Sequence, residues 1–232
     1  MWLKNPRMQR LVGRWNCLMD WAVDAVAVWQ FVALRGHKDP ETVAFIRRIR
    51  KERYSLCTPF EAWLVFSLAQ AQSRLEGDMA EVGVFAGATA KLLCEAKGPR
   101  RLHLFDTFAG LPEPSDFEKQ VHTKNQFACS LDSVQAYLAS YPNVNYHAGR
   151  FPDTAEPLNG VRLSFAHFDV DLYESTLACL EFFYPRMVPG GIMLSHDYSM
   201  LAGVKKAFDE FLADKPEQAI ELPTTQCMIV KR

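Results

Sequence analysis

The stretch "EVGVFAGATA", residues 81–90, reads as a short strand that ends in glycine and runs directly into a helix. Gly83 and Gly87 let the backbone come close to a ligand, and the N-terminus of the following helix offers free N–H groups. The stretch is not G-x-G-x-x-G, and it lacks the Lys-Ser/Thr pair of a phosphate-binding P-loop. Because glycine is common at strand-to-helix turns, this turn alone indicates only where a ligand could bind.

Strands alternate with helices through the rest of the chain. The expected strands cover 79–85, 101–106, 144–151, 161–171 and 190–198, and the expected helices cover 88–98, 132–142, 173–187 and 203–216. This alternation implies right-handed crossovers and a mainly parallel sheet, closed by a hairpin of "AIELP" and "QCMIVKR". The long segment 107–130 is interpreted as a lid whose His122 could meet a substrate.

Residues 1–54 are expected to form a helical N-terminal extension, with helices over 10–36 and 39–54. The α/β domain would then cover 55–232. The Trp- and Phe-rich face of the extension predicts either docking onto the body or contact between the subunits of a homodimer.

Polar residues at helix starts predict where two helices of the α/β domain begin. Thr58 and Glu61 are spaced for a capping box, and Gly77 would end that helix. Asp132 or Ser133 would cap the helix expected after the lid.

The composition is that of an ordinary globular protein, with 232 residues, 49% hydrophobic, 23% charged and a formal net charge of −1. Net charge therefore does not favour a nucleic-acid partner. Residues 1–54 carry eleven Lys and Arg, among them Arg7, Arg10 and Arg14, against five Asp and Glu, so this segment is near +6 and the remainder near −7. This asymmetry suits docking, a basic substrate or weak surface contacts, although a solvated helix face is the simpler interpretation.

The six cysteines, Cys17 among them, are scattered without a C-x-x-C pair or zinc spacing. This indicates small core residues in a reducing cytosol, so we expect a cytoplasmic protein. The apolar stretch from 21 to 34 is too short for a membrane span. Asp20 and Asp24 in this region argue against a signal peptide.

Asp106 ends the second expected strand, about twenty residues after the glycine turn. A carboxylate at that place can accept both hydroxyls of an adenosine ribose. The simpler interpretation, a turn residue, would be preferred without the glycines. Together the two features predict a cofactor that contains a nucleoside.

Acidic residues gather where two further strands end. Asp169 and Asp171 close the fourth strand, and His196 and Asp197 close the fifth. Buried carboxylates lose several kcal/mol of hydration, and a divalent cation would offset this cost. The alternative for Asp171 is to cap the next helix, which would start near Leu172.

Four stretches, "EVGVFAGATA", "LFDTFAGLPEP", "FDVDLYESTLACLEFFYPRMVPGGIMLSHDY" and "GVKKAFDEF", resemble the macrocin O-methyltransferase family. The resemblance covers about residues 55–215. It implies a class I methyltransferase fold, with a seven-stranded, mostly parallel sheet and an antiparallel last strand. It also implies S-adenosylmethionine, a divalent cation such as Mg²⁺ or Mn²⁺, and a small hydroxylated acceptor, the sugar of an antibiotic.

The same resemblance implies roles for individual residues. The cofactor would lie against Glu81, Gly83, Phe85, Gly87, Asp106 and Thr107, with Asp106 at the ribose. The cation would be held by Asp169, His196 and Asp197, and Asp171 would be the general base.

The family usually reads Asp-Asp-Tyr where this chain has His196-Asp197-Tyr198. Imidazole ligates Mn²⁺, Fe²⁺ or Zn²⁺, but it is a poor partner for Mg²⁺. Either the metal preference has shifted, or His196 is itself a catalytic base beside a weakly bound cation.

Two other functions are compatible with an α/β fold of this kind. A short-chain oxidoreductase that binds a dinucleotide would need a pyrophosphate glycine loop and a Tyr-x-x-x-Lys pair, and neither is found at the right place. A non-catalytic nucleoside-binding module that acts through residues 1–54 stays open, because His196 departs from the family pattern.

Overall fold

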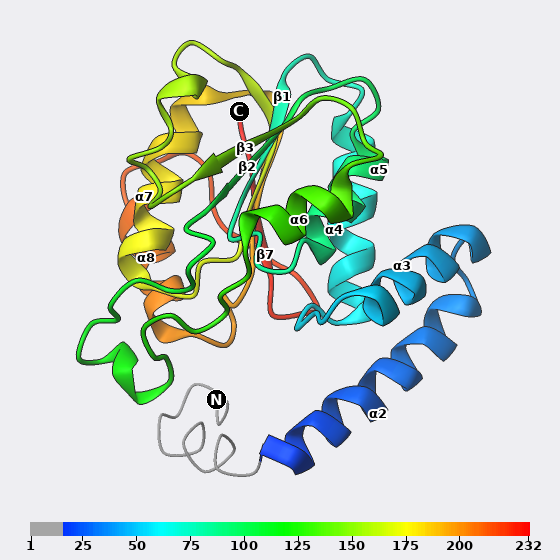
Figure 1. The fold of residues 1–232 in the computed structure, drawn as a ribbon. Helices are drawn as coiled ribbons and strands as arrows, with labels where there is room; N and C mark the ends of the chain where they lie inside the picture. Colours follow the sequence, from blue (N-terminus) through cyan, green and yellow to red (C-terminus); the bar gives the residue numbers. More distant parts are fainter. Residues whose placement is uncertain (1–15) are drawn as a thin grey trace.

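A sheet covered by helices on both faces lies at the centre of the computed structural model, which describes the backbone of residues 16–232 (Figure 1). Side chains are described from residue 25 onward. The predicted helical residues 10–15, the side chains of Arg7, Arg10 and Arg14 and the thiol of Cys17 lie outside the described part.

Within residues 16–232, the strands pair in the order β3-β2-β1-β4-β5-β7-β6. β1 to β5 run parallel, whereas β7 is antiparallel to both β5 and β6. This confirms the predicted seven-stranded class I methyltransferase sheet and its closing hairpin. The strands are β1 (Asp78–Val82), β2 (Leu102–Asp106), β3 (Val144–Ala148), β4 (Leu163–Phe168), β5 (Met187–Ser195), β6 (Ile220–Glu221) and β7 (Cys227–Val230).

Two hydrophobic clusters fill the space between the sheet and its helices. The first joins the sheet to α4 (Pro59–Gln72), α5 (Ala88–Ala96) and α6 (Leu131–Leu138). The second joins it to α7 (Tyr173–Phe183) and α8 (Ala202–Phe211) on the other face (Figure 1). β4 is buried along its whole length, as expected for a central strand with both faces covered.

Some of the predicted helix caps are present in the structure and others are not. The capping box of Thr58 and Glu61 is confirmed at the start of α4. The predicted caps of α6 were wrong, because Ser130 caps this helix through a hydrogen bond from the backbone N–H of Ser133 at 3.4 Å. Gly77 does not end α4, which stops at Gln72.

Gly77 instead permits the close approach of β4. Its φ is +134°, and a Cβ there would lie 2.7 Å from the backbone nitrogen of Ser164. The glycine therefore belongs to strand packing and not to the helix end.

The N-terminal extension consists, in its described part, of α2 (Asn16–Arg35) and α3 (Pro40–Glu52). Asp39 caps α3 by accepting a hydrogen bond from the backbone N–H of Thr42 at 2.8 Å. Phe31, Leu34 and Ile46 belong to the same buried cluster as the residues of α4. The C-terminal half of α2 thus docks onto the body, while the division of the chain at residue 54 stays a prediction.

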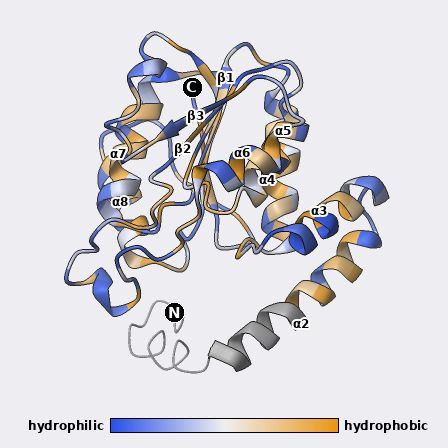
Figure 2. Ribbon diagram, viewed as in Figure 1, coloured by the Kyte–Doolittle hydropathy of each residue, from blue (hydrophilic) through white to orange (hydrophobic). Residues whose placement is uncertain are grey.

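A second apolar face of α2 is exposed. Val28, Trp29 and Val32 are each more than half exposed, with values of 63%, 64% and 63%. Figure 2 shows this hydrophobic part of α2, which projects away from the sheet. Among the described helices, none is long and apolar enough to cross a membrane.

Parallel strands bring the predicted site residues to one edge of the sheet. β4 ends at Phe168, so Asp169 and Asp171 lie on the following loop and not within the strand. Phe168 pairs in register with Ser195, the last residue of β5, and His196 comes next.

Gly83 holds the loop after β1 against the loop after β4. Its φ is +87°, and a Cβ there would lie 1.9 Å from the carbonyl oxygen of Asp169. Only glycine permits this contact without a shift of the backbone.

We expect Gly83→Ala to lower the free energy of unfolding by more than about 3 kcal/mol, because strain and a backbone clash add up. Thermal unfolding followed by circular dichroism measures this loss. The matched control is Gly160→Ala, whose φ is +80° but whose Cβ would meet nothing within 4 Å. It should cost only about 1–2 kcal/mol, and equal losses in both variants would contradict the clash.

Candidate active site

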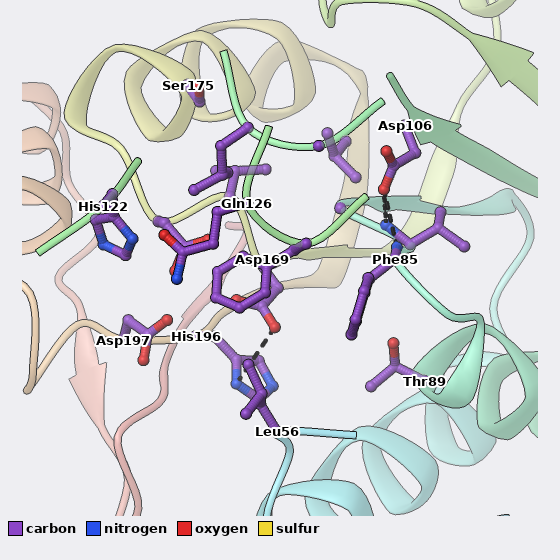
Figure 3. Close-up of a pocket in the computed structure, with 18 of the residues that line it drawn as sticks. Leu56, Phe85, Thr89, Asp106, His122, Gln126, Asp169, Ser175, His196 and Asp197 are labelled. Atoms are coloured by element: carbon purple, nitrogen blue, oxygen red, sulfur yellow. Dashed lines mark hydrogen bonds and ion pairs between the residues drawn. The ribbon is translucent and has the colours of Figure 1, made fainter. Parts of the chain in front are cut away.

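A cavity of about 1050 Å³ opens along the carboxyl ends of β1, β2, β4 and β5 (Figure 3). The residues that link α3 to α4, here 54–58, form one wall, and the segment 107–130 forms another. The predicted residues that line it are Gly83, Phe85, Asp106, Thr107, Asp169, Asp171, His196 and Asp197. Glu81 and Gly87 are not among its lining residues.

Asp106 organises the turn between β1 and α5. Its Oδ2 accepts hydrogen bonds from the backbone N–H groups of Val84 at 2.7 Å and Phe85 at 2.8 Å (Figure 3). Its Oδ1 accepts one from the backbone N–H of Phe108 at 2.7 Å. The hydroxyl of Thr107 lies 3.4 Å from the same oxygen, so the turn's own groups surround this carboxylate and the predicted ribose contact stays a prediction.

The turn itself gives a cofactor an aromatic wall and a helix start. Gly87 has a φ of +81° and immediately precedes α5. The ring of Phe85 lies 5.7 Å from that of Phe127 and 6.2 Å from that of Tyr54, both edge-on. Thr107 donates a hydrogen bond to the carbonyl oxygen of Gly110 at 2.7 Å, which shapes the start of the lid segment.

Glu81 and His167 form a fully buried pair next to the cavity. The Nδ1 of His167 lies 2.9 Å from the Oε1 of Glu81. Burial raises the pKa of Glu81 to about 8 and holds the pKa of His167 well below its usual value. At neutral pH the pair is therefore uncharged overall, and the predicted contact of Glu81 with a cofactor stays a prediction.

Three carboxylates converge at the edge of the sheet. Asp169, Asp171 and Asp197 each offer one oxygen, and these oxygens lie within 4.8 Å of one another. Oxygens bound to one ion at about 2.0–2.6 Å can be at most about 5 Å apart. The donor set therefore fits a divalent cation that prefers oxygen ligands.

The electrostatics of this cluster agree with that fit. Burial, followed by the charges of Glu61 and Glu81, raises the pKa of Asp169 to about 7. Burial and neighbouring Asp169 raise the pKa of Asp171 to about 8, and burial with both neighbours raises the pKa of Asp197 well above its usual value. Without a positive charge among them, the three carboxylates resist simultaneous ionisation.

Backbone strain is also concentrated here. Asp171 and Asp197 both have left-handed backbone conformations, with φ values of +58° and +60°. The N-cap of α7 is Leu172, which makes no side-chain cap bond, and the N–H of Tyr173 is bound instead by Oε1 of Glu118 at 2.7 Å. The alternative role of Asp171 as a helix cap therefore finds no support.

His196 lies beside this cluster with a second set of neighbours. Its Nδ1 is 3.9 Å from Oδ2 of Asp169 (Figure 3), and its Nε2 is 2.8 Å from Nε2 of Gln226. Cys57, Glu61 and His196 also form a buried group within 4.8 Å. Its predicted roles as ligand and base stay predictions, and these neighbours were missed because they lie far away in the sequence.

His122 faces the cavity from the lid segment (Figure 3). It is only 7% exposed, yet neither ring nitrogen has a hydrogen-bond partner among the described residues. Burial lowers its pKa, so the ring is neutral near pH 7 and offers one donor and one acceptor. These are the groups that a hydroxylated ligand would engage.

The sheet order with its reversed β7, and a cavity at the carboxyl ends of the strands, define a class I methyltransferase fold. The solved structure of the O-methyltransferase NovP shares it, with a TM-score of 0.68 and 23% identity over 77% of this chain and 82% of that chain. A family model described as macrocin-O-methyltransferase (TylF) matches residues 67–227. The chain belongs to this family, which confirms the resemblance found in its sequence.

Two curated relatives show how far the similarity extends. A tetracenomycin-type rhamnosyl 4'-O-methyltransferase of Streptomyces olivaceus is 34% identical over 140 residues, which are 53% of this chain and 54% of the relative. Demethyldecarbamoylnovobiocin O-methyltransferase of Streptomyces niveus is 29% identical over 160 residues, which are 61% of this chain and 60% of the relative. The chain thus spans little more than half the length of these relatives.

The raised pKa values predict how the stability of the cation-free protein depends on pH. Unfolded aspartates titrate near pH 4, so between about pH 4 and 8 the folded protein binds more protons, and its stability falls as pH rises. We expect Mg²⁺ or Mn²⁺ at ~10 mM to raise the melting temperature by about 3 °C or more at pH 8, and by less at pH 5.5.

The control for this experiment is Asp197→Asn, which removes one of the three charges. Its melting temperature without cation should fall less steeply between pH 5.5 and 8, and the cation should no longer stabilise it. Identical pH profiles of the two proteins, measured by calorimetry, would contradict the electrostatic argument.

Proposed function

We propose that this protein is an S-adenosylmethionine-dependent, cation-assisted O-methyltransferase that acts on a hydroxyl of a small molecule, the sugar of a natural-product glycoside. The observation that carries the proposal is the cluster of Asp169, Asp171 and Asp197 in the same cavity as the turn held by Asp106. Membership of the macrocin O-methyltransferase family supports the reaction class.

The cofactor half of the cavity suits a sulfonium nucleoside. Asp106 would accept the ribose hydroxyls, and Phe85 would pack against the cofactor from the turn. A sulfonium carries a positive charge, so the acidic edge of the sheet favours it. Since its methyl group is already activated, the protein must mainly align oxygen, carbon and sulfur.

The acceptor half must make a poor nucleophile reactive. A cation held by Asp169 and Asp197 would lower the pKa of an acceptor hydroxyl, and Asp171 beside them would stay free to act as the base. Asp171 would accept the proton at a carboxylate oxygen, and a base whose pKa lies near the working pH suits that task. His122 would hold another polar group of the acceptor from the lid segment.

The two other functions gain no support from the described residues. The turn after β1 offers no pyrophosphate loop, and membership of the macrocin O-methyltransferase family favours methyl transfer over a silent binding module. We further propose a cytoplasmic homodimer whose contact includes Trp29 on the exposed face of α2. A monomer in analytical sedimentation would remove the dimer from this proposal.

The direct test is transfer of a labelled methyl group from S-adenosylmethionine to a panel of methyl 6-deoxyhexosides and nucleoside-diphosphate deoxysugars. We expect transfer to at least one member, dependent on Mg²⁺ or Mn²⁺ and lost after dialysis against EDTA. Failure with the whole panel, together with no calorimetric binding of the cofactor, would overturn the proposed function. Full activity after the dialysis would contradict only the role of the cation and would leave the proposed methyl transfer in place.

Replacement of the proposed base should separate chemistry from cofactor binding. We expect Asp171→Asn to reduce kcat at least about 100-fold, the usual contribution of a general base, while the Kd for S-adenosylmethionine changes less than about threefold. Asp116→Asn, at a lid carboxylate whose side chain is 98% exposed, is the matched control and should leave both unchanged. Loss of cofactor affinity in Asp171→Asn would contradict the base role.

A further inference from the structure

Three aromatic rings from three separate segments meet inside the cavity. Tyr54 comes from the residues that link α3 to α4, Phe85 from the turn after β1, and Phe127 from the end of the lid segment. We propose that this aromatic corner (Tyr54, Phe85 and Phe127) binds the positive charge of the sulfonium group of S-adenosylmethionine. The site would thereby distinguish the methyl donor from S-adenosylhomocysteine, its product, whose sulfur is neutral. The inference rests on the cofactor proposed above.

The rings of the aromatic corner stand at steep angles to one another. Tyr54 and Phe85 have ring centroids 6.2 Å apart and planes at 89°, and Phe85 and Phe127 have centroids 5.7 Å apart and planes at 66°. No other ring of the described residues pairs with any of the three. The rings therefore form walls and not a stack, and aromatic walls of this kind surround the ammonium groups that aromatic cages bind.

Within the described part of the chain, no lysine or arginine lies over a ring of the aromatic corner. An aromatic face is electron-rich and attracts a positive charge. Elsewhere the protein supplies that charge itself. The guanidinium of Arg53 and the ammonium of Lys91, for example, lie 4.5 and 4.2 Å from the ring centre of Tyr137. In the cavity this attraction is left for a ligand.

Two of the three rings belong to residues with strained backbones. Phe85 and Phe127 have φ values of +47° and +62°, a left-handed conformation that bulky residues rarely adopt. The N–H of Phe85 donates a hydrogen bond to Oδ2 of Asp106 at 2.8 Å. The carbonyl oxygen of Gln126, directly before Phe127, accepts one from the N–H of Leu111 at 2.8 Å. Strained backbones that are fixed in this way cluster at ligand clamps, which supports a binding role for the two rings.

The aromatic corner lies near the place that the proposed complex requires for the sulfur. The ribose would be at Asp106 and the acceptor hydroxyl at the carboxylate cluster, and the sulfur joins the ribose to the methyl group that is transferred. Gly83, two residues before Phe85, lies against the carbonyl oxygen of Asp169, so one turn connects the two ends. Figure 3 shows the ring of Phe85 extending from this turn into the cavity, on the side away from Asp106. A sulfonium between the two ends would therefore pass next to Phe85.

Methyl transfer removes the charge that the aromatic corner would hold. The bond between sulfur and the methyl carbon breaks and its electron pair stays on sulfur, while the acceptor oxygen forms the new bond and its proton passes to Asp171. The sulfur is then a neutral thioether, with which the rings keep only apolar contact. The aromatic corner would thus strengthen the binding of the donor more than that of the product, and so favour exchange of the spent cofactor.

The test compares the binding of the two cofactor forms to the full chain by calorimetry, without any acceptor. Tyr54→Leu and Phe127→Leu each replace a ring by an apolar side chain. We expect each variant to raise the ratio of the Kd for S-adenosylmethionine to the Kd for S-adenosylhomocysteine by about threefold or more, the usual contribution of a cation–π contact. The ratio isolates the effect of the charge, because lost apolar contact weakens both forms alike.

Conservative variants and a matched control accompany this measurement. Tyr54→Phe and Phe127→Tyr keep a ring and should leave the ratio of the two Kd values unchanged. Phe117→Leu is the control, because this ring is 55% exposed in the lid segment and does not line the cavity. Circular dichroism checks that each variant is folded. Tyr54 is 62% exposed, so its replacements decide the question even if Phe127→Leu does not fold.

The outcomes separate this inference from the proposed function. If the leucine variants weaken both cofactor forms equally, or weaken neither, the rings do not act on the charge and the inference is overturned, while the proposed methyl transfer stands. If the wild type binds neither form at millimolar concentration, the proposed function falls and this inference falls with it.

Discussion

Repulsion among partly buried carboxylates at one edge of the sheet is the constraint on which the rest of the site depends. Asp169, Asp171 and Asp197 are brought together by two neighbouring strands whose ends lie in register. Their pKa values are raised because three charges in that place are unfavourable. Two of its members have left-handed backbone conformations, and such a combination is typical of functional sites.

The same edge joins the cofactor turn to the acidic cluster. Gly83 lets the loop after β1 touch the backbone of Asp169, and Asp106 ties that loop to the end of β2. The residues that link α3 to α4 close the cavity from the other side. The N-terminal extension therefore ends at the wall of the site, and its helices share the core of the α/β domain.

Much of the fold could be predicted because its signals are local. Alternation of strands and helices, the reversed last strand and the capping box of Thr58 with Glu61 all follow from short stretches. The places of Asp106 and Asp169 at strand ends follow from the same pattern. The cap of α6 and the role of Gly77 were misjudged, because several residues could cap and because the contact of Gly77 with β4 lies far along the chain.

The surroundings of His196 could not be predicted for the same reason. Cys57 lies 139 positions before it, and Gln226 lies 30 positions after it, directly before the antiparallel strand β7. No periodicity relates these residues, so their meeting depends on the completed sheet. Sequence reasoning could name the histidine as a departure from the family pattern but could not name the residues that surround it.

The hydrogen bond between Glu118 and the N-terminus of α7 couples the lid segment to that helix. Glu118 belongs to the same segment as His122. Displacing this segment would therefore also break the hydrogen bond that Glu118 accepts from the first turn of α7. A hydrogen bond to a charged group contributes about 1.5–3 kcal/mol. Movement of this segment away from the cavity and fraying of the first turn of α7 would then occur together, because one hydrogen bond joins the two.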